Sequence, residues 1–262
     1  MSGEPRVGPT LLERLDLALV SRLVGSPTAN DEMLATAQRF QDRIYRRTGT
    51  DARFIAGVLR LRGLLVMDDD AADVLTGSTS RFQSTSQEFQ MIRGLQEVLQ
   101  ILRDRGSRGT PPDGWFLVEL FKTMTRGLPR FRNNVLRVDP PWDAVLYVRY
   151  PLPQELNYLL DTFDLAHRYR DFPRLFDDLH PVRQGFRILW RFARISPFPD
   201  FNVSMAWLAM SGWLLARGYP LILPEAQDQA LLARLVGGPP PGKVVQFESR
   251  LLETIEAFGA GG

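Results

Sequence analysis

The sequence contains no cysteine, which excludes disulfides and metal sites built on thiolate ligands. Its first residues lack the apolar segment of a signal peptide. Long hydrophobic runs are also missing: the longest mainly apolar stretch covers residues 205–216, whereas a membrane-spanning helix needs about 20 residues. We therefore expect a cytoplasmic protein without a membrane partner.

Lysine is nearly absent, because only two of the 32 basic residues, Lys122 and Lys243, are lysines. The net charge is +2, and the arginines are scattered through the chain without forming a basic run. Surfaces that bind nucleic acid usually gather their basic side chains on one face, often among aromatic residues. We therefore expect no nucleic-acid partner.

The sequence does contain helical periodicity over most of its length. The three- and four-residue spacing of apolar side chains predicts amphipathic helices in residues 11–23, 30–47, 54–65, 89–102 and 115–124. An apolar fraction of 44% over 262 residues is enough for one large core, or for a core with a small accessory domain. The expected fold is mainly α, with residues 1–75 as an N-terminal helical extension.

Two segments depart from this helical pattern. Residues 131–150 are β-like, but Asp139, Pro140 and Pro141 interrupt them, so we expect a short β-hairpin (a flap) or an extended loop. Residues 236–262 begin with a linker rich in proline and glycine, and they end in a predicted helix with one apolar stripe. That helix either packs on the body of the protein or offers a docking face.

Residues 195–222 hold the most informative pattern of the chain. Pro197, Phe198, Asp200 and Asn202 precede an apolar helix that ends at Gly218-Tyr219-Pro220. This order resembles the signature of the Fic (Fido-fold) family, H-P-F-x-[D/E]-G-N-G-R-x-x-R followed by a buried helix and a G-Y-P turn. Other landmarks match in order and spacing, so the resemblance covers about residues 76–222. It implies a Fic-like core over residues 76–235.

The residues that carry the family's chemistry are replaced in this motif. A Fic enzyme transfers AMP from ATP–Mg²⁺ to a protein hydroxyl, and the motif histidine takes the hydroxyl proton. Ser196 stands in that place, and a serine hydroxyl is not basic. Phe201 and Val203 stand in the places of the two glycines that let the backbone approach phosphate. Ser204 and Trp207 stand in the places of the two arginines and bring no charge.

The inhibitory element of the family is altered in the same way. Family members often carry an inhibitory helix marked [S/T]-x-x-x-E-[G/N], whose glutamate pairs with the second motif arginine. Residues 79–84 fit this spacing, with Gln83 in the glutamate place. Both members of the pair are therefore replaced, as Gln83 and Trp207, which avoids leaving one uncompensated charge. This double replacement suggests that neither ATP binding nor its inhibition is maintained.

Two retained polar residues of the motif could still contact a ligand. Asp200 could meet a cation through water, which makes it a weak candidate metal ligand, and Asn202 could form a hydrogen bond to a ligand. One acidic residue without an anion cradle makes a poor site for a magnesium nucleotide. We therefore expect no cofactor.

The replaced motif is surrounded by aromatic side chains, which leaves two structural alternatives. They fill the vacated nucleotide cleft, or they line a reshaped pocket for a flatter, apolar or aromatic ligand. The candidate lining residues of such a pocket are Phe198, Phe201, Asn202, Trp207 and Gln83. Its polar points would be the motif positions Ser196, Asp200, Asn202 and Ser204.

Two functional hypotheses follow from the resemblance and its departures. The first is a pseudoenzyme, a binding or regulatory protein whose partner surface includes residues 76–90 and 131–150. The second is a repurposed enzyme that acts on a less anionic substrate in the aromatic pocket. The fold alone does not decide between them.

Two other candidate sites are weaker. Ser196 could be a nucleophile with His180 as its base, but an intervening helix would separate the two residues by about 22 Å, at about 1.5 Å per residue. The aspartates at 68, 69, 70 and 73 lack the spacing of a calcium loop, so we expect a solvated helix start there.

Overall fold

The computed structural model describes residues 50–143, 149–163, 181–219, 221–225, 228 and 232. The helices expected in residues 11–23, 30–47 and 236–262 lie outside this part of the chain, as do both histidines. The outcome for those segments stays a prediction.

The predicted mainly α fold is confirmed. The described residues contain seven α-helices, two short 3₁₀ helices and no strand. The α-helices are α3 (Thr50–Leu61), α4 (Asp68–Thr76), α5 (Gln87–Gly106), α6 (Gly114–Thr125), α7 (Leu156–Asp161), α10 (Pro181–Ile195) and α11 (Asn202–Ala216). The 3₁₀ helices are η1 (Pro129–Phe131) and η2 (Pro153–Glu155). None of the helices among these residues is long and apolar enough to cross a membrane.

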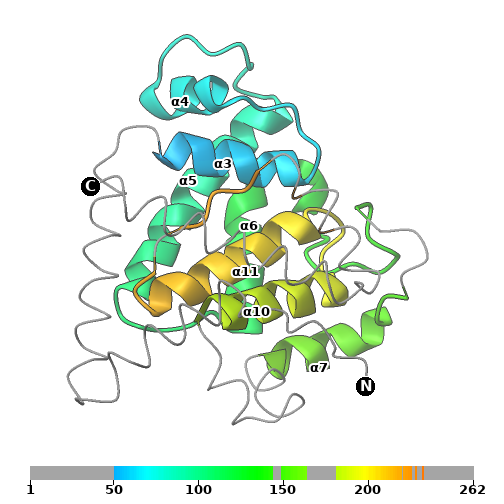
Figure 1. Ribbon diagram of the computed structural model, residues 1–262. Helices are drawn as coiled ribbons and strands as arrows, with labels where there is room; N and C mark the ends of the chain where they lie inside the picture. Colours follow the sequence, from blue (N-terminus) through cyan, green and yellow to red (C-terminus); the bar gives the residue numbers. More distant parts are fainter. Residues whose placement is uncertain are drawn as a thin grey trace, which may run out of the picture.

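Helix α11 lies at the centre of the helical body and packs against α10, α5, α3 and α6 (Figure 1). Its side chains from Ser204 to Leu215 are all buried, as expected for a helix that is apolar on every side. Its neighbour α10 is amphipathic: Phe186, Leu189 and Phe192 face the core, and Arg194 is exposed. The motif segment between α10 and α11 is therefore anchored at both ends by closely packed helices.

Helices α5 and α6 approach each other closely because of a glycine. A Cβ atom at Gly94 would lie 2.2 Å from the backbone oxygen of Met124. Since real Cβ atoms do not come this near to backbone, the helix pair depends on this glycine. The pair supports one side of α11.

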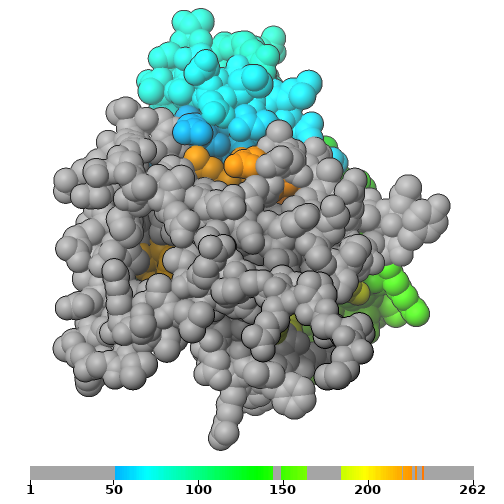
Figure 2. All heavy atoms as spheres, viewed as in Figure 1, coloured from blue at the N-terminus to red at the C-terminus, as the bar shows by residue number. Residues whose placement is uncertain are grey.

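Helices α3 and α4 share the core of the other helices. Phe54, Ile55 and Val58 of α3 are fully buried within the same hydrophobic cluster as α5 and α11. The surface of the α3–α4 region forms the upper part of the face seen in Figure 2. The described part of the expected N-terminal extension is thus packed into the helical body, and the boundary at residue 75 stays a prediction.

The acidic run that begins at Asp68 forms the start of α4, as expected. Three aspartates occupy the first turn, where the free N–H groups and the helix dipole favour negative charge. Asp70 accepts a hydrogen bond from the Met67 N–H at 2.7 Å and pairs with Arg81. These contacts give the aspartates a structural role.

Two segments that the sequence singled out, residues 79–84 and 131–150, are loops where the structure describes them, apart from Phe131 at the end of η1. Residues 79–84, compared above with an inhibitory helix, are not helical, and Gln83 is exposed. The reason is local: Gly77 ends α4 in a left-handed conformation, and Ser86 caps α5, so the polar residues between them form a connecting loop. The described part of residues 131–150 is an extended loop after η1, and residues 144–148 lie outside the described chain.

Candidate functional site

The motif loop, residues 196–201, joins the end of α10 to the start of α11. Ser196 and Phe201 take left-handed backbone conformations, with φ of 43° and 62°. They are the only residues other than glycine with positive φ in the described part of the chain. Such a conformation costs a non-glycine residue about 1–2 kcal/mol, so the surrounding packing holds the loop in this shape. Phe201 therefore keeps the left-handed backbone that a motif glycine would favour.

Ser196 makes its contacts with the protein itself. Its Oγ donates a hydrogen bond to the Ala193 carbonyl at 2.6 Å, and its N–H donates to the Phe192 carbonyl at 3.0 Å. Its own carbonyl accepts a bond of 2.6 Å from Arg137 Nε. These bonds close the last turn of α10, which gives the buried serine a structural role at the histidine place.

Asp200 is buried and paired with arginines. Arg62, just after α3, binds its carboxylate through Nε and Nη2, and Arg130 of η1 lies 3.6 Å away. The Phe201 N–H donates a further bond of 2.7 Å to the carboxylate. Burial by itself lowers the pKa of Arg62, but the hydrogen bond and charge of Asp200, together with the charge of Asp143, raise it by more, so Arg62 stays charged. The candidate metal ligand therefore has cationic partners from its own chain.

Asn202 holds the motif loop in a tight turn. Its Oδ1 accepts from the Phe198 N–H at 2.9 Å, and its Nδ2 donates to the Phe198 carbonyl at 2.9 Å. The same Nδ2 donates to Asp143 at 2.8 Å. Both polar atoms of the Asn202 side chain, Oδ1 and Nδ2, therefore form hydrogen bonds within the protein.

Asp143 is a site residue that the sequence analysis missed. Its carboxylate accepts hydrogen bonds from the Asn202 N–H at 2.6 Å and, more weakly, from the Val203 N–H at 3.4 Å. These N–H groups belong to the first turn of α11, where a helix attracts anions. Burial raises the pKa of Asp143, and the bonds from Asn202 offset only part of this effect. A side chain of the chain itself thus fills the anion position of α11.

Ser204 and Trp207, which align with the two arginines of the family signature, are buried and bonded internally. Ser204 donates from Oγ to the Val58 carbonyl of α3 at 2.8 Å. Trp207 donates from Nε1 to the Ile222 carbonyl at 3.0 Å. Neither side chain has any exposed surface, so both are part of the packed core.

The aromatic residues of the loop pack against other rings. Phe198 stacks on Phe121 with the ring centres 4.0 Å apart, and Phe201 meets Phe131 edge to face at 6.1 Å. Both loop residues are fully buried. Gln83, expected beside them as a pocket residue, is instead exposed in the loop between α4 and α5. This packing agrees with the alternative in which aromatic side chains fill the cleft.

Residues 134–143, which we call the strap, run along the motif loop. The Arg137 N–H donates to the Pro197 carbonyl at 3.0 Å, and the Trp142 N–H donates to the Pro199 carbonyl at 2.7 Å. The buried Arg137 guanidinium also bonds the carbonyls of Ser196 and Pro151, each at 2.6 Å. Burial lowers its pKa, since these partners are neutral.

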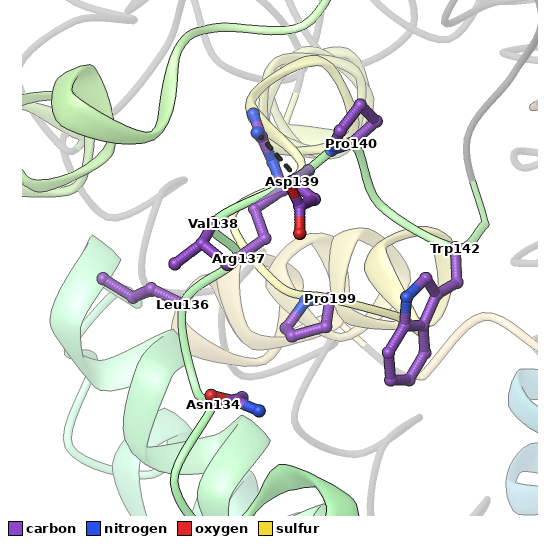
Figure 3. A pocket seen from close by; sticks show the side chains of 8 residues that line it. All are labelled: Asn134, Leu136, Arg137, Val138, Asp139, Pro140, Trp142 and Pro199. Atoms are coloured by element: carbon purple, nitrogen blue, oxygen red, sulfur yellow. Dashed lines mark hydrogen bonds between the residues drawn. The ribbon is translucent and has the colours of Figure 1, made fainter.

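A small cavity opens beside the strap. It has a volume of about 120 Å³ and is lined by Asn134, Leu136, Arg137, Val138, Asp139, Pro140, Trp142 and Pro199. In the close view, Pro199 of the motif loop lies between the side chains of Leu136 and Trp142 (Figure 3). Only Pro199 of this lining comes from the motif loop.

Comparison with known proteins finds similarity at the level of structure. No protein-family model and no curated protein sequence matches the chain. A Fic-domain-containing signalling protein from Bacteroides thetaiotaomicron matches with a TM-score of 0.63 at 17% identity, over 94% of each chain. A Fic family protein from Desulfovibrio desulfuricans matches with a TM-score of 0.60 at 15% identity, over 98% of this chain and 76% of that one.

A third solved structure extends the comparison to an animal protein. Fic-1 from C. elegans matches with a TM-score of 0.60 at 15% identity, over 97% of this chain and 80% of the other. At such low identity, similarity of structure establishes the fold and leaves activity to be argued from the site. The helical order, the motif loop and these matches together show that the chain has the Fic (Fido) fold.

Proposed function

We propose that this Fic-fold chain is a cytoplasmic binding or regulatory protein that does not carry out standard AMP transfer. One observation supports the proposal most strongly: the polar side chains of the motif bind partners within the chain. Asp200 binds Arg62, Asn202 binds Asp143, and Ser204 binds the Val58 carbonyl. A ligand would have to displace these contacts before it could use the same groups.

The magnesium nucleotide that the fold family implies does not fit these residues. The Asp143 carboxylate lies at the N–H groups that would meet a phosphate, and two negative groups cannot share that position without a large electrostatic cost. Ser196 cannot act as a general base, and Trp207 offers no charge in the second arginine place. No step of AMP transfer can be assigned to this set of side chains.

The alternative of a repurposed enzyme calls for a ligand-sized cavity that reaches the motif. Ser196 and Asn202 are both buried. The cavity beside the strap, about 120 Å³, is smaller than the usual range for ligand sites, about 300–1,000 Å³. In the part of the chain that the structure describes, the geometry therefore favours a partner-binding role, with a protein or a small apolar ligand as the partner.

The strap and its surroundings are the candidate partner surface. Val138 is 75% exposed and Trp142 is 57% exposed, and both line the cavity beside the motif loop. Exposed apolar side chains that are grouped around a hollow are typical of recognition surfaces. We expect partner contacts at these two residues.

A thermal-shift titration tests the proposal. The purified chain is titrated with ATP, GTP, CTP, UDP-sugars and CDP-choline, each with and without Mg²⁺. A ligand that binds the native state raises the melting temperature in a concentration-dependent way. We expect no saturable rise across this panel. A saturable rise with any nucleotide would contradict the proposal and direct the next assay to transfer of its group.

A further inference from the structure

The strap is fastened to the motif loop at a few atoms. Arg137 and Trp142 reach backbone carbonyls of the loop, and Asp143 reaches the first turn of α11. Between Arg137 and Trp142 the residues Val138, Asp139 and Pro140 are exposed, whereas Pro141 is buried. The attachment of the strap therefore combines hydrogen bonds to the loop with apolar contacts at Pro141 and between Trp142 and Phe131.

Some interactions of the Asp143 carboxylate favour the closed strap, and others oppose it. Closing the strap takes this carboxylate partly out of water and brings it near the Asp200 carboxylate, and both effects are unfavourable. The Asn202 N–H, the Asn202 side chain and the charge of Arg62 oppose these costs. A contact in which costs and gains offset each other can open without the core unfolding.

We propose that the strap is a latch over the motif loop and that Asp143 is its catch. When Asp143 leaves Asn202, the strap lifts from Pro197 and Pro199 and uncovers the loop. The inference rests on the proposed function, because a partner that uses the motif loop must first displace this internal carboxylate. The latch makes the site autoinhibited by its own chain.

The groups that face the catch come from three elements. Asn202 and Val203 of α11 donate N–H groups, and Arg62 after α3 supplies a positive charge. Asp200 of the motif loop supplies a negative charge. Asp143 therefore connects the strap with α11, the motif loop and Arg62 after α3, so a change at any of them alters how firmly the strap is held.

Hydrogen exchange of backbone amides tests the latch in the full chain. In Asp143→Ala, the amides of Asn202, Val203, Arg137 and Trp142 should exchange at least about tenfold faster, because charge-assisted hydrogen bonds that hold the strap are lost. The control is Asp139→Ala, which removes the same charge from an exposed side chain of the same strap. Its exchange should match that of the unaltered chain, and the amides of α5 should be unchanged in both variants.

Equal exchange in the Asp143→Ala and Asp139→Ala variants would overturn the latch. If Asp143→Ala also accelerates exchange in α5, then Asp143→Asn decides, because this variant keeps nearly the same shape but loses the charge and one of the two oxygens that accept from Asn202. Faster exchange of the strap with a protected α5 supports the latch in that variant, and unchanged strap exchange contradicts it. The experiment uses no nucleotide, so nucleotide binding would overturn the proposed function without altering this result.

Discussion

The first turn of α11 differs sharply from the rest of the same helix. From Met205 to Leu215 the helix is buried among apolar side chains of the neighbouring helices. The first turn is instead bound by polar groups of distant segments, namely Asp143 of the strap and the Val58 carbonyl of α3. The buried part of the helix secures the fold, whereas the first turn determines what the site can bind.

In the motif loop, the backbone conformation resembles that of a glycine-containing loop, but the side chains are large and buried. Phe201 keeps a left-handed conformation that glycine would adopt without strain. Its ring, however, fills space against Phe131 and beneath Arg62. The loop thus combines a left-handed backbone at Phe201 with side chains that are part of the core.

The largest effect is expected within the buried part of α11. Trp207→Ala removes a fully buried indole and its hydrogen bond to the Ile222 carbonyl. Loss of such a side chain leaves a cavity and lowers the free energy of unfolding by about 3–5 kcal/mol. Chemical denaturation measures the loss. The control is Trp115→Ala, whose side chain is 43% exposed and which should cost much less. Equal losses would contradict the assignment of Trp207 to the core.

The next effect is expected at the polar end of α11. Arg62→Ala removes the main cationic partner of the buried Asp200 and leaves Arg130 at 3.6 Å. We expect the free energy of unfolding to fall by about 1–3 kcal/mol, because a buried carboxylate loses charge-assisted bonds. Arg53→Ala in α3 is the control, since its pair with Asp68 is exposed. If both variants lose the same stability, Arg62 has no special role at the motif.

Backbone strain at Phe201 should have a smaller effect on stability, and it predicts that glycine is favoured over alanine at this position. Phe201→Gly and Phe201→Ala both lose the ring, but glycine accepts the left-handed conformation. The glycine variant should therefore be more stable than the alanine variant by about 1 kcal/mol. At Val203, in the first turn of α11, the order should reverse because alanine favours helix. Denaturation of the four variants measures both differences, and the same order at both positions would contradict the retained loop shape.

The smallest effect concerns pH. The pKa of Asp143 is raised in the folded chain, so the folded state holds this proton more tightly than the unfolded state. Its contribution to stability is therefore complete below the ordinary aspartate pKa of about 3.9 and is lost as pH rises through the raised value. The stability of Asp143→Asn relative to the unaltered chain should increase over this window and then level off. A relative stability that falls with rising pH would contradict a raised pKa for the partly buried carboxylate at this position.

The fold and the location of the motif could be predicted from the sequence, because both depend on local patterns. The spacing of apolar residues gave the helices, and Pro197, Phe198, Asp200 and Asn202 marked the loop. Asp143 and Arg62 could not be predicted in the same way. They contact the motif from 59 and 138 residues away, and no periodicity relates a polar side chain to such a distant partner.

The inhibitory helix that the family resemblance implies at residues 79–84 is absent for a different physical reason. The resemblance there rests on the spacing of a few polar positions, which does not specify a helix without an apolar stripe. Gly77 and Ser86 instead end one helix and begin the next, leaving a loop between them. Local capping decided the structure of this segment.

The first turn of α11 is occupied by the chain's own carboxylate, Asp143. The most direct test is an NMR titration with ATP–Mg²⁺ that follows the backbone amides of Asn202 and Val203. If Asp143 holds these groups, their resonances should not move as the nucleotide is added. Saturable shifts confined to these two amides and to Arg62 would show that the nucleotide displaces Asp143, and would contradict the account.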